Sequence, residues 1–412
     1  MTNEQAIFDL FADMSGKIIK DVWCPTLYRI AYMRRRAWLL DKISRNSRLV
    51  GNDLSVKIPF LTGYGSSWRP MGELGYTPTG SPLKSAVQTA SLGCHAAAIQ
   101  VTEKAIRATK GSASIINGII DEQMKGLTET FPYYVRALAW TPASGILGVQ
   151  AGAISTLTVT LDNAGLWNTA VTDRAKLFEP GMFVQVLTSG YVKVGDPVEI
   201  TAVDKVLGTI TLASDPGCAD NCVFVLSDIA GLENGYNNSG PGILDAIDND
   251  NTFQGVDRST AANSKFRAVV TGSAGAVLYA TLSQFFHDCY DPEFACTNYK
   301  VIDRYWALNI QENVRYTPYD VNVKDGYRSI LVKNTQLIED DDCDCDKIIV
   351  PNLKNLSIQE APGGISNLFD KGWQQVHGRP FMEYIVAYWA SLVAEDCRYM
   401  GRLDGISLTA TS

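Results

Sequence analysis

The chain has 412 residues, of which 46% are hydrophobic and 19% are charged, and its formal net charge is -8. This composition is typical of a folded protein of two or three domains, and it argues against a nucleic-acid-binding protein whose whole surface is basic. No run of about eighteen apolar residues occurs, and the first residues carry acids where a signal peptide is basic, so we expect a cytoplasmic protein.

Residues 1–48 form the first distinct segment. Their polar character, with apolar positions between Ile7 and Ile18, predicts a helical N-terminal arm. Between Arg29 and Arg48 lie seven basic residues and one acid. This part is either a cationic arm that contacts nucleic acid or an acidic partner, or a solvated arm packed on its neighbours, and the second interpretation is favoured.

Residues 51–101 change to a pattern of strands and turns. Residues 54–60 alternate between apolar and polar, and a second extended stretch runs from Ala86 to Val101. Residues 62–82 between them contain five glycines and three prolines. The segment is therefore predicted to be a long two-stranded ribbon with a turn-rich tip.

The ribbon tip carries side chains suited to a contact with a neighbouring subunit, namely Trp68, Arg69, Met71 and Tyr76. Because a two-stranded ribbon is marginally stable alone, we expect residues 53–100 to be mobile in isolated subunits and ordered in assemblies. Trp and Arg are enriched where binding energy concentrates, so we expect the tip to make intersubunit contacts. The alternative is a Trp68 that folds back on its own ribbon against Met71 or Tyr76.

Residues 112–140 carry apolar side chains at steps of three and four, which places one stripe on a single face of an α-helix. Ser112 or Ser114 can cap the start of this helix, and Pro132 removes a backbone N–H and predicts a kink. At about 1.5 Å per residue the helix would span about 40 Å. We interpret it as a spine around which the rest of the chain is organised.

Residues 145–227 contain several short strands separated by turns and predict a small antiparallel barrel or sandwich, separable from the remainder. Cys218 and Cys222 lie near its end. A zinc site would need two more nearby ligands, and neither a second CxxC nor a His pair accompanies them, so a metal there is disfavoured. The nine cysteines are scattered along the chain, and most are expected to be thiols in a reducing compartment.

The last part of the chain mixes loops, helices and strands. After a glycine- and asparagine-rich loop, the segment from Thr271 to Tyr290 predicts an amphipathic helix. Six acids lie between Glu339 and Asp346. They could hold calcium, but their spacing is not that of an EF-hand, and a solvated loop is favoured. Residues 381–394 and 397–408 predict long closing strands.

The sequence offers few residues for catalysis. It has three histidines, His95, His287 and His377, and none has a partner at the spacing of a metal or nucleophile motif, so each is interpreted as structural. Nucleotide-binding glycine loops and the serine-hydrolase elbow are missing from the sequence. We therefore expect no enzymatic activity, no cofactor and no metal site.

The order of these parts resembles the major capsid protein of tailed bacteriophages, a family with the Hong Kong 97-type fold. The most suggestive stretches are TFQGVDRS at 252–259 and MGRLDGI at 400–406. The resemblance implies an α+β fold with an N-terminal arm, an extended loop, a peripheral domain with a long spine helix, an axial domain and an inserted β-barrel-like module.

The resemblance also implies boundaries for these parts. They are an N-terminal arm at 1–48, an extended loop at 49–101, a peripheral domain with the spine helix at 102–144, an inserted β module at 145–227, an axial domain with a crossing strand of the peripheral domain at 228–352, and a return to the peripheral domain at 353–412.

The function implied is a structural one, in which pentamers and hexamers of the chain assemble in the host bacterial cytoplasm into the icosahedral shell of the virion around double-stranded DNA. A separate scaffolding protein, a portal and a cement protein are implied as partners. Packaged DNA would be contacted weakly and non-specifically, and no membrane is involved. Two alternatives stay open, an encapsulin-like nanocompartment with cargo protein and a β-rich phage tail or carbohydrate-binding protein. Against the last, the eight tryptophans are dispersed.

Overall fold

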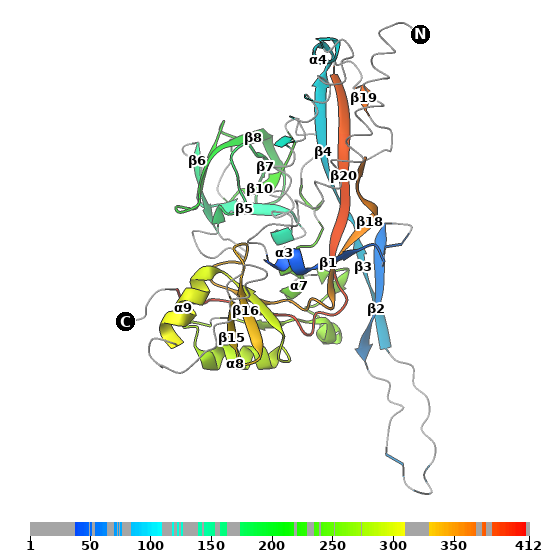
Figure 1. The fold of residues 1–412 in the computed structure, drawn as a ribbon, viewed down its shortest axis with the longest axis vertical. Helices are drawn as coiled ribbons and strands as arrows, with labels where there is room; N and C mark the ends of the chain where they lie inside the picture. Colours follow the sequence, from blue (N-terminus) through cyan, green and yellow to red (C-terminus); the bar gives the residue numbers. More distant parts are fainter. Residues whose placement is uncertain are drawn as a thin grey trace.

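The computed structural model describes residues 38–48, 50–51, 54–63, 70–71, 73, 75, 84–108, 118, 122, 125–126, 139–141, 144–152, 157–162, 174–217, 221–228, 235–238, 240–250, 252–272, 274–309, 329–367, 373–375 and 381–408. The fold is α+β. Figure 1 shows a long sheet along one side, a barrel and a smaller α/β part beside it, and a ribbon that leaves the body at one end.

The long sheet is built around β20, whose bounds confirm the predicted closing strand at 381–394. β20 pairs along Phe381–Ala390 with β4 on one side and along Val386–Ala394 with β18 on the other, both antiparallel. Burial on both sides explains its almost unbroken apolar sequence. The strands of this sheet are β1 (Ser44–Asn46), β4 (Gly93–Thr102), β18 (Leu356–Asn367), β19 (Gln374–Gln375) and β20 (Phe381–Ala394).

The described end of the predicted N-terminal arm belongs to the core. In α3 (Trp38–Lys42) the first three side chains are buried, and β1 then pairs in parallel with β18. The apolar triplet Trp38, Leu39 and Leu40 explains this, because burying it stabilises the fold more than solvating it. The expectation of a solvated arm is therefore wrong for Trp38, Leu39, Leu40 and Ile43, whereas Lys42, Ser44 and residues 46–48 are exposed. Residues 1–37 lie outside the described residues.

The ribbon consists of β2 (Ser55–Gly63) and β3 (Lys84–Ser91) in antiparallel register, with Val56 opposite Ala90. The predicted extended stretch from Ala86 to Val101 is confirmed as strand except at Leu92, but it belongs to the ribbon only as far as Ser91. The chain leaves the ribbon at Leu92 and enters β4 of the long sheet. Gly93 permits this change because a Cβ there would lie 2.9 Å from the backbone nitrogen of Gly240.

The predicted spine helix at 112–140 lies mostly outside the described residues. Its described positions, Gly118, Glu122, Lys125, Gly126, Ala139 and Trp140, are helical. Upstream of them, the short helix α4 (Glu103–Ala108) follows β4, and Thr102 Oγ1 accepts a hydrogen bond from the Ala105 N–H near its start. The kink expected at Pro132 stays a prediction.

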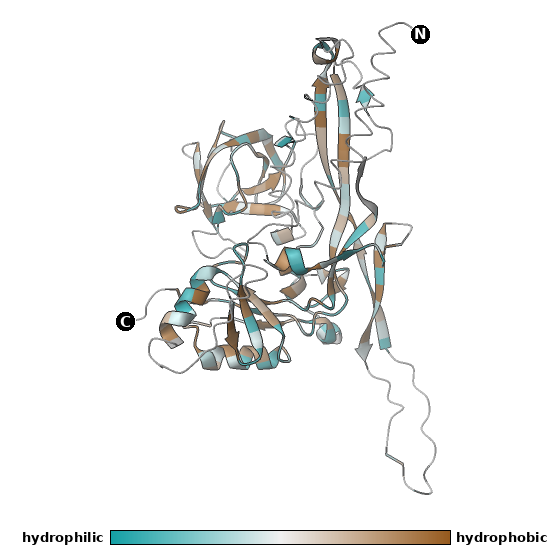
Figure 2. Ribbon diagram, in the orientation of Figure 1, coloured by the Kyte–Doolittle hydropathy of each residue, from teal (hydrophilic) through white to brown (hydrophobic). Residues whose placement is uncertain are grey.

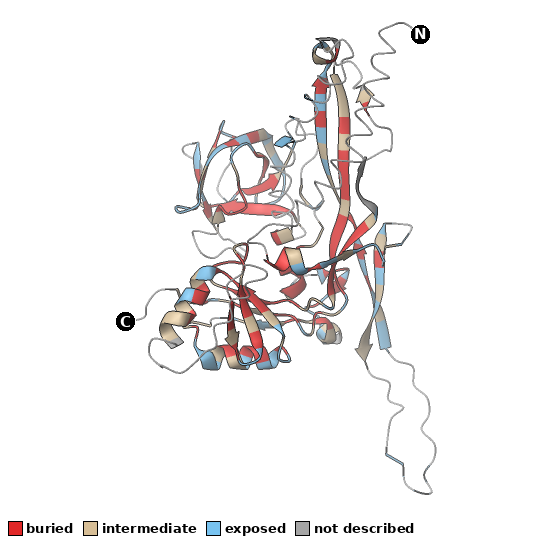
Figure 3. Cartoon of the chain, in the orientation of Figure 1, coloured by how far each residue is buried: buried red, intermediate tan, exposed pale blue. Residues whose placement is uncertain are grey.

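A closed barrel occupies the segment for which the sequence predicts a small antiparallel barrel or sandwich. Its strands, in spatial order, are β10 (Val223–Leu226), β5 (Ile146–Gln150), β6 (Thr158–Asp162), β9 (Thr209–Leu212), β8 (Lys193–Asp204) and β7 (Phe183–Leu187). Its interior is apolar, and the rings of Phe178 and Phe224 pack edge to face at 6.3 Å. Hydrophobic colour in Figure 2 coincides with burial in Figure 3 along β5.

A six-stranded sheet with two helices forms the α/β part. The strands are β13 (Val269–Thr271), β21 (Gly401–Leu403), β17 (Ile348–Val350), β14 (Phe294–Thr297), β16 (Thr335–Glu339) and β15 (Ser329–Val332), and the helices are α8 (Tyr279–Asp288) and α9 (Tyr299–Asn309). The helix predicted at 271–290 is therefore shorter, since α8 covers only Tyr279–Asp288. The strand predicted at 397–408 is reduced to the three residues of β21, and it begins late because the Met400 N–H bonds to the Cys397 carbonyl in a turn.

Short elements connect the three parts. They are α7 (Ile243–Ile247), the hairpin of β11 (Thr252–Phe253) and β12 (Val256–Asp257), and a 3-10 helix, η2 (Ala261–Phe266). One apolar cluster runs from the long sheet through α3, α7 and η2 into the barrel, and a second fills the α/β part.

Candidate assembly surface

The base of the ribbon is supported within its own chain. Val56 and Ala90 are buried against Val393 of β20, and the ring of Phe60 lies 5.0 Å from that of Phe266 in η2. These contacts explain the alternating sequence of β2, whose inner face is apolar. The expectation that the whole ribbon depends on a neighbour is therefore wrong for the base.

The hairpin within TFQGVDRS fastens the ribbon. Gln254 and Gly255 have φ of 51° and 75°, as the two central residues of a type I′ turn require. The carbonyl of Gln254 accepts a bond from Thr89 N–H at 2.8 Å. When its side-chain amide is oriented so that both the nitrogen and the oxygen have partners, Gln254 also donates to Gln88 Oε1 at 2.6 Å and forms hydrogen bonds with the backbone of Ala394.

The same stretch contains a fully buried arginine. Arg258 is 0% exposed, and its guanidinium donates to the carbonyls of Asp245 and Ala246 in the last turn of α7, at 2.7 Å to Ala246. A cation at a helix C-terminus satisfies carbonyls that lack partners within the helix. Burial lowers the pKa of Arg258, and the neighbouring Cys397, Asp248 and Asp245 oppose this shift. TFQGVDRS is therefore a structural junction, which its sequence alone does not reveal.

The outer part of the ribbon presents exposed apolar side chains. Val87 is 59% exposed and Met71 is 55% exposed. The other tip residues for which contacts are expected, Trp68, Arg69 and Tyr76, lie outside the described residues. The tip contact stays a prediction for all four.

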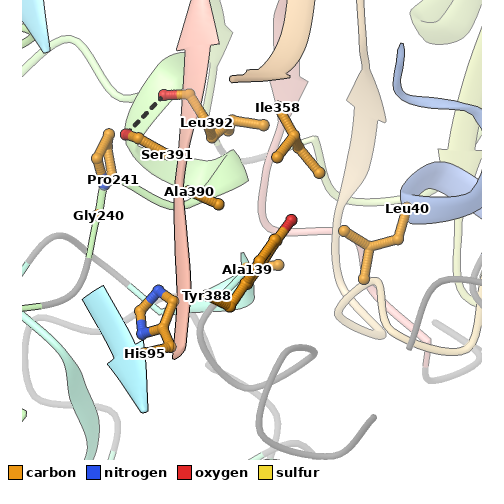
Figure 4. Close-up of a pocket in the computed structure, with 10 residues that line it drawn as sticks. All are labelled: Leu40, His95, Ala139, Gly240, Pro241, Ile358, Tyr388, Ala390, Ser391 and Leu392. Atoms are coloured by element: carbon orange, nitrogen blue, oxygen red, sulfur yellow. Dashed lines mark hydrogen bonds between the residues drawn. The ribbon is translucent and has the colours of Figure 1, made fainter. Parts of the chain in front are cut away.

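A small cavity of about 60 Å³ lies beside the long sheet and is lined mainly by apolar groups (Figure 4). His95 of β4 reaches its wall directly across the ladder from Tyr388 of β20. Burial lowers the pKa of His95 to about 4, so the imidazole is neutral near pH 7. This agrees with the structural role expected for this histidine.

The acidic run before β17 forms a buried turn, and the expected solvated loop is wrong. Asp340, Asp342 and Asp344 are between 1% and 4% exposed. We call residues 340–347 the acidic junction. It connects with segments distant in sequence, because Asp340 accepts the Leu39 N–H of α3 at 2.8 Å and Asp344 binds Lys176 Nζ of the barrel segment at 3.1 Å.

The charged groups of the acidic junction differ in how well neighbouring charges compensate them. Lys347 Nζ lies 3.0 Å from Asp346 and 3.6 Å from Asp344. Burial alone would lower the pKa of Lys347, but these two carboxylates outweigh it and raise the pKa. Burial raises the pKa of Asp340 to about 7, and the charge of Asp342 adds to the rise, while hydrogen bonds from the Leu39 and Asp342 N–H groups and the charge of Lys176 oppose it.

The described cysteines are buried, except for Cys94, which is half-buried. Cys94, Cys289, Cys296, Cys343, Cys345 and Cys397 are not in disulfides, as expected for most of the cysteines. Burial raises the pKa of Cys289 and of Cys397 to about 12, so both stay protonated thiols. Cys222 is disulfide-bonded, which is compatible with an expectation made for most of the cysteines.

Within the described ranges, no three His, Cys, Asp or Glu side chains are grouped so that they could hold a metal ion. In the same part of the chain, no helix combines the length and the apolar character needed to cross a membrane.

Comparison of the sequence with protein-family models and with curated proteins finds no match. Solved structures are similar over most of both chains. A chain of the holo-SrpI encapsulin complex from Synechococcus elongatus has a TM-score of 0.46 at 9% identity, with 92% of this chain and 90% of that chain covered. The cyanophage A-1(L) capsid has a TM-score of 0.47 at 10% identity, with 90% and 91% covered.

The capsid of the native GTA particle is also similar, with a TM-score of 0.42 at 12% identity and with 92% and 91% of the two chains covered. Phage capsids recur among the similar structures, among them those of phage XM1 and cyanophage P-SCSP1u.

Proposed function

We propose that this chain is the major capsid protein of a tailed bacteriophage, which assembles through pentamers and hexamers into an icosahedral shell around double-stranded DNA. The observation that carries the proposal is the β2–β3 ribbon. Its base is seated on β20 and η2, whereas its free end points away from the body (Figure 1). A neighbouring molecule can bury the exposed apolar groups of such an element and so stabilise it.

The remaining parts fit this role. We assign the extended loop, the spine, the inserted module and the axial domain to the residue ranges that the sequence predicts for them. The one change is that the extended loop ends at Ser91. The barrel is the accessory module, and the α/β part with α8 and α9 belongs to the axial domain except for β21, which the segment 353–412 contributes to its sheet. A scaffolding protein, a portal and a cement protein are the proposed partners, and the virion capsid is the proposed location.

Expression of the chain with and without a candidate scaffolding protein, followed by electron microscopy, tests the proposal. Closed icosahedral particles are expected, and a chain that stays monomeric or forms only fibres under all conditions would overturn it. The content of the particles separates the capsid from the encapsulin-like alternative, because a nanocompartment encloses cargo protein. A tail or carbohydrate-binding protein would form no closed shell.

A further inference from the structure

Tyr290 occupies a backbone position that normally belongs to glycine. The Asp291 N–H bonds to the Phe286 carbonyl at 2.8 Å and the Tyr290 N–H to the His287 carbonyl at 3.0 Å, which is the Schellman arrangement at the end of α8. Tyr290 and Asp291 accordingly have φ of 62° and 50°. Bulky L residues rarely adopt this left-handed region, and glycine is the usual residue at the first of these positions.

The side chain held in this unfavourable position is not used to fill the core. Tyr290 is 72% exposed, and its ring packs edge to face on Tyr399 with centroids 5.1 Å apart. The guanidinium of Arg398 lies 5.5 Å from the centre of the Tyr399 ring. Two aromatic rings and an arginine, the residue types enriched at binding hot spots, thus form one ordered surface group.

The surroundings of the rings are fixed by ion pairs. Lys333 Nζ binds Asp291 at 2.8 Å, and Lys333 also has a positive φ, of 58°. On the other flank Asp396 accepts two bonds from Arg398 Nε, at 2.9 and 3.0 Å. The group is therefore already ordered before any partner arrives, which lowers the entropic cost of binding.

We propose that the Tyr290–Tyr399–Arg398 group is a contact surface for a second copy of this chain. The occupant rests on the proposed function, because the neighbours of a subunit within a shell of one protein are copies of it. The flanking charges agree with a protein partner. Lys333 and Arg398 are each bound to a carboxylate and are poorly placed to neutralise the phosphates of DNA, whereas an aromatic centre within a charged rim is typical of protein interfaces.

Tyr290→Gly tests the inference, because it removes the ring and supplies the residue that the backbone position favours. The concentration needed for particle formation should rise by about tenfold or more, while the thermal midpoint of the unassembled subunit stays the same or rises. Tyr290→Phe, which keeps the ring, should assemble like the wild type. Tyr299→Ala is the matched control, since Tyr299 is 41% exposed on α9 without a positive φ.

Assembly of Tyr290→Gly at the wild-type concentration would overturn the inference while leaving the proposed function intact. A variant with both weaker assembly and a lower thermal midpoint would also overturn it, because the residue would then act through folding. A wild-type chain that forms no particles would overturn the proposed function and this inference together.

Discussion

Asp340 is a carboxyl group whose charge is controlled by burial. Its pKa is raised to about 7 in the folded chain, against an ordinary value of 3.8. Between these two values the folded state keeps a proton that the unfolded state has released. Stability from this group is therefore complete below about pH 4 and is lost as pH rises toward 7.

Asp340→Asn should remove this pH dependence. The Asn amide keeps one oxygen, which can still accept a hydrogen bond from the Leu39 N–H. It lacks the second carboxyl oxygen, which accepts from the Asp342 N–H, and this loss lowers the free energy of unfolding by the same amount at every pH. The stability of the variant relative to the wild type should therefore increase from pH 5 to pH 8, by roughly 2 kcal/mol. Urea unfolding of subunits at both pH values measures the change, with Asp341→Asn as a neighbouring control. Equal pH slopes for the Asp340 variant and the wild type would contradict the assignment.

Elements with a local pattern are predictable from this sequence, and elements fixed by distant partners are not. The alternation in 54–60 and the apolar run in 381–394 reveal β2 and β20, because a strand buried on one face alternates and a strand buried on both faces is apolar throughout. The end of the ribbon at Ser91 depends on the close approach of Gly93 to Gly240, which no local pattern shows. The acidic junction reads as a solvated loop because its partner Lys176 is 168 residues away.

The candidate site shows the same division. The glycines, prolines and large side chains of the predicted tip are visible together in the sequence, and Met71 among them is exposed. The positive φ of Tyr290 and its stacking on Tyr399 are not visible, because the ring partner comes from a segment about a hundred residues later.

Gln88→Leu tests how the ribbon is fastened. Gln88 is 1% exposed, and its amide donates to the Glu395 carbonyl at 3.2 Å. Leu can neither donate to this carbonyl nor accept from the amide of the buried Gln254, and the loss of this acceptor should cost about 1–3 kcal/mol. Hydrogen exchange in residues 84–91 should accelerate while exchange in the barrel strands stays unchanged. Ser85→Ala, on the exposed part of β3, serves as the control, and unchanged protection of β3 in Gln88→Leu would refute the fastening role.

At the scale of the whole molecule, a charged pair joins the barrel segment to the α/β part. The side chains of Lys176 and Asp344 are 10% and 3% exposed. Lys176→Met leaves the Asp344 carboxylate buried with Lys347 Nζ at 3.6 Å and should cost about 3 kcal/mol of unfolding free energy. Adding Asp344→Leu to the variant should recover most of the loss, because no buried charge is then left uncompensated.

The pair of Lys205 and Glu179 is the matched control for this prediction. Its atoms are closer, at 2.6 Å, but its side chains are 46% and 26% exposed. Lys205→Met should therefore cost less than about 1 kcal/mol in the same unfolding experiment. Similar losses for Lys176→Met and Lys205→Met would contradict a buried electrostatic link.

The parallel pairing of β1 with β18 brings Ser44 opposite Ser357, and the seat of the ribbon includes Val393 and Glu395. On the ribosome the N-terminal segments emerge first and must wait until residues as far along as Glu395 have been made before their partners exist. The barrel strands, all contained within Ile146–Leu226, can close much earlier. A nascent or truncated chain that lacks Val393 therefore cannot hold its ribbon in place, although its barrel can already be closed.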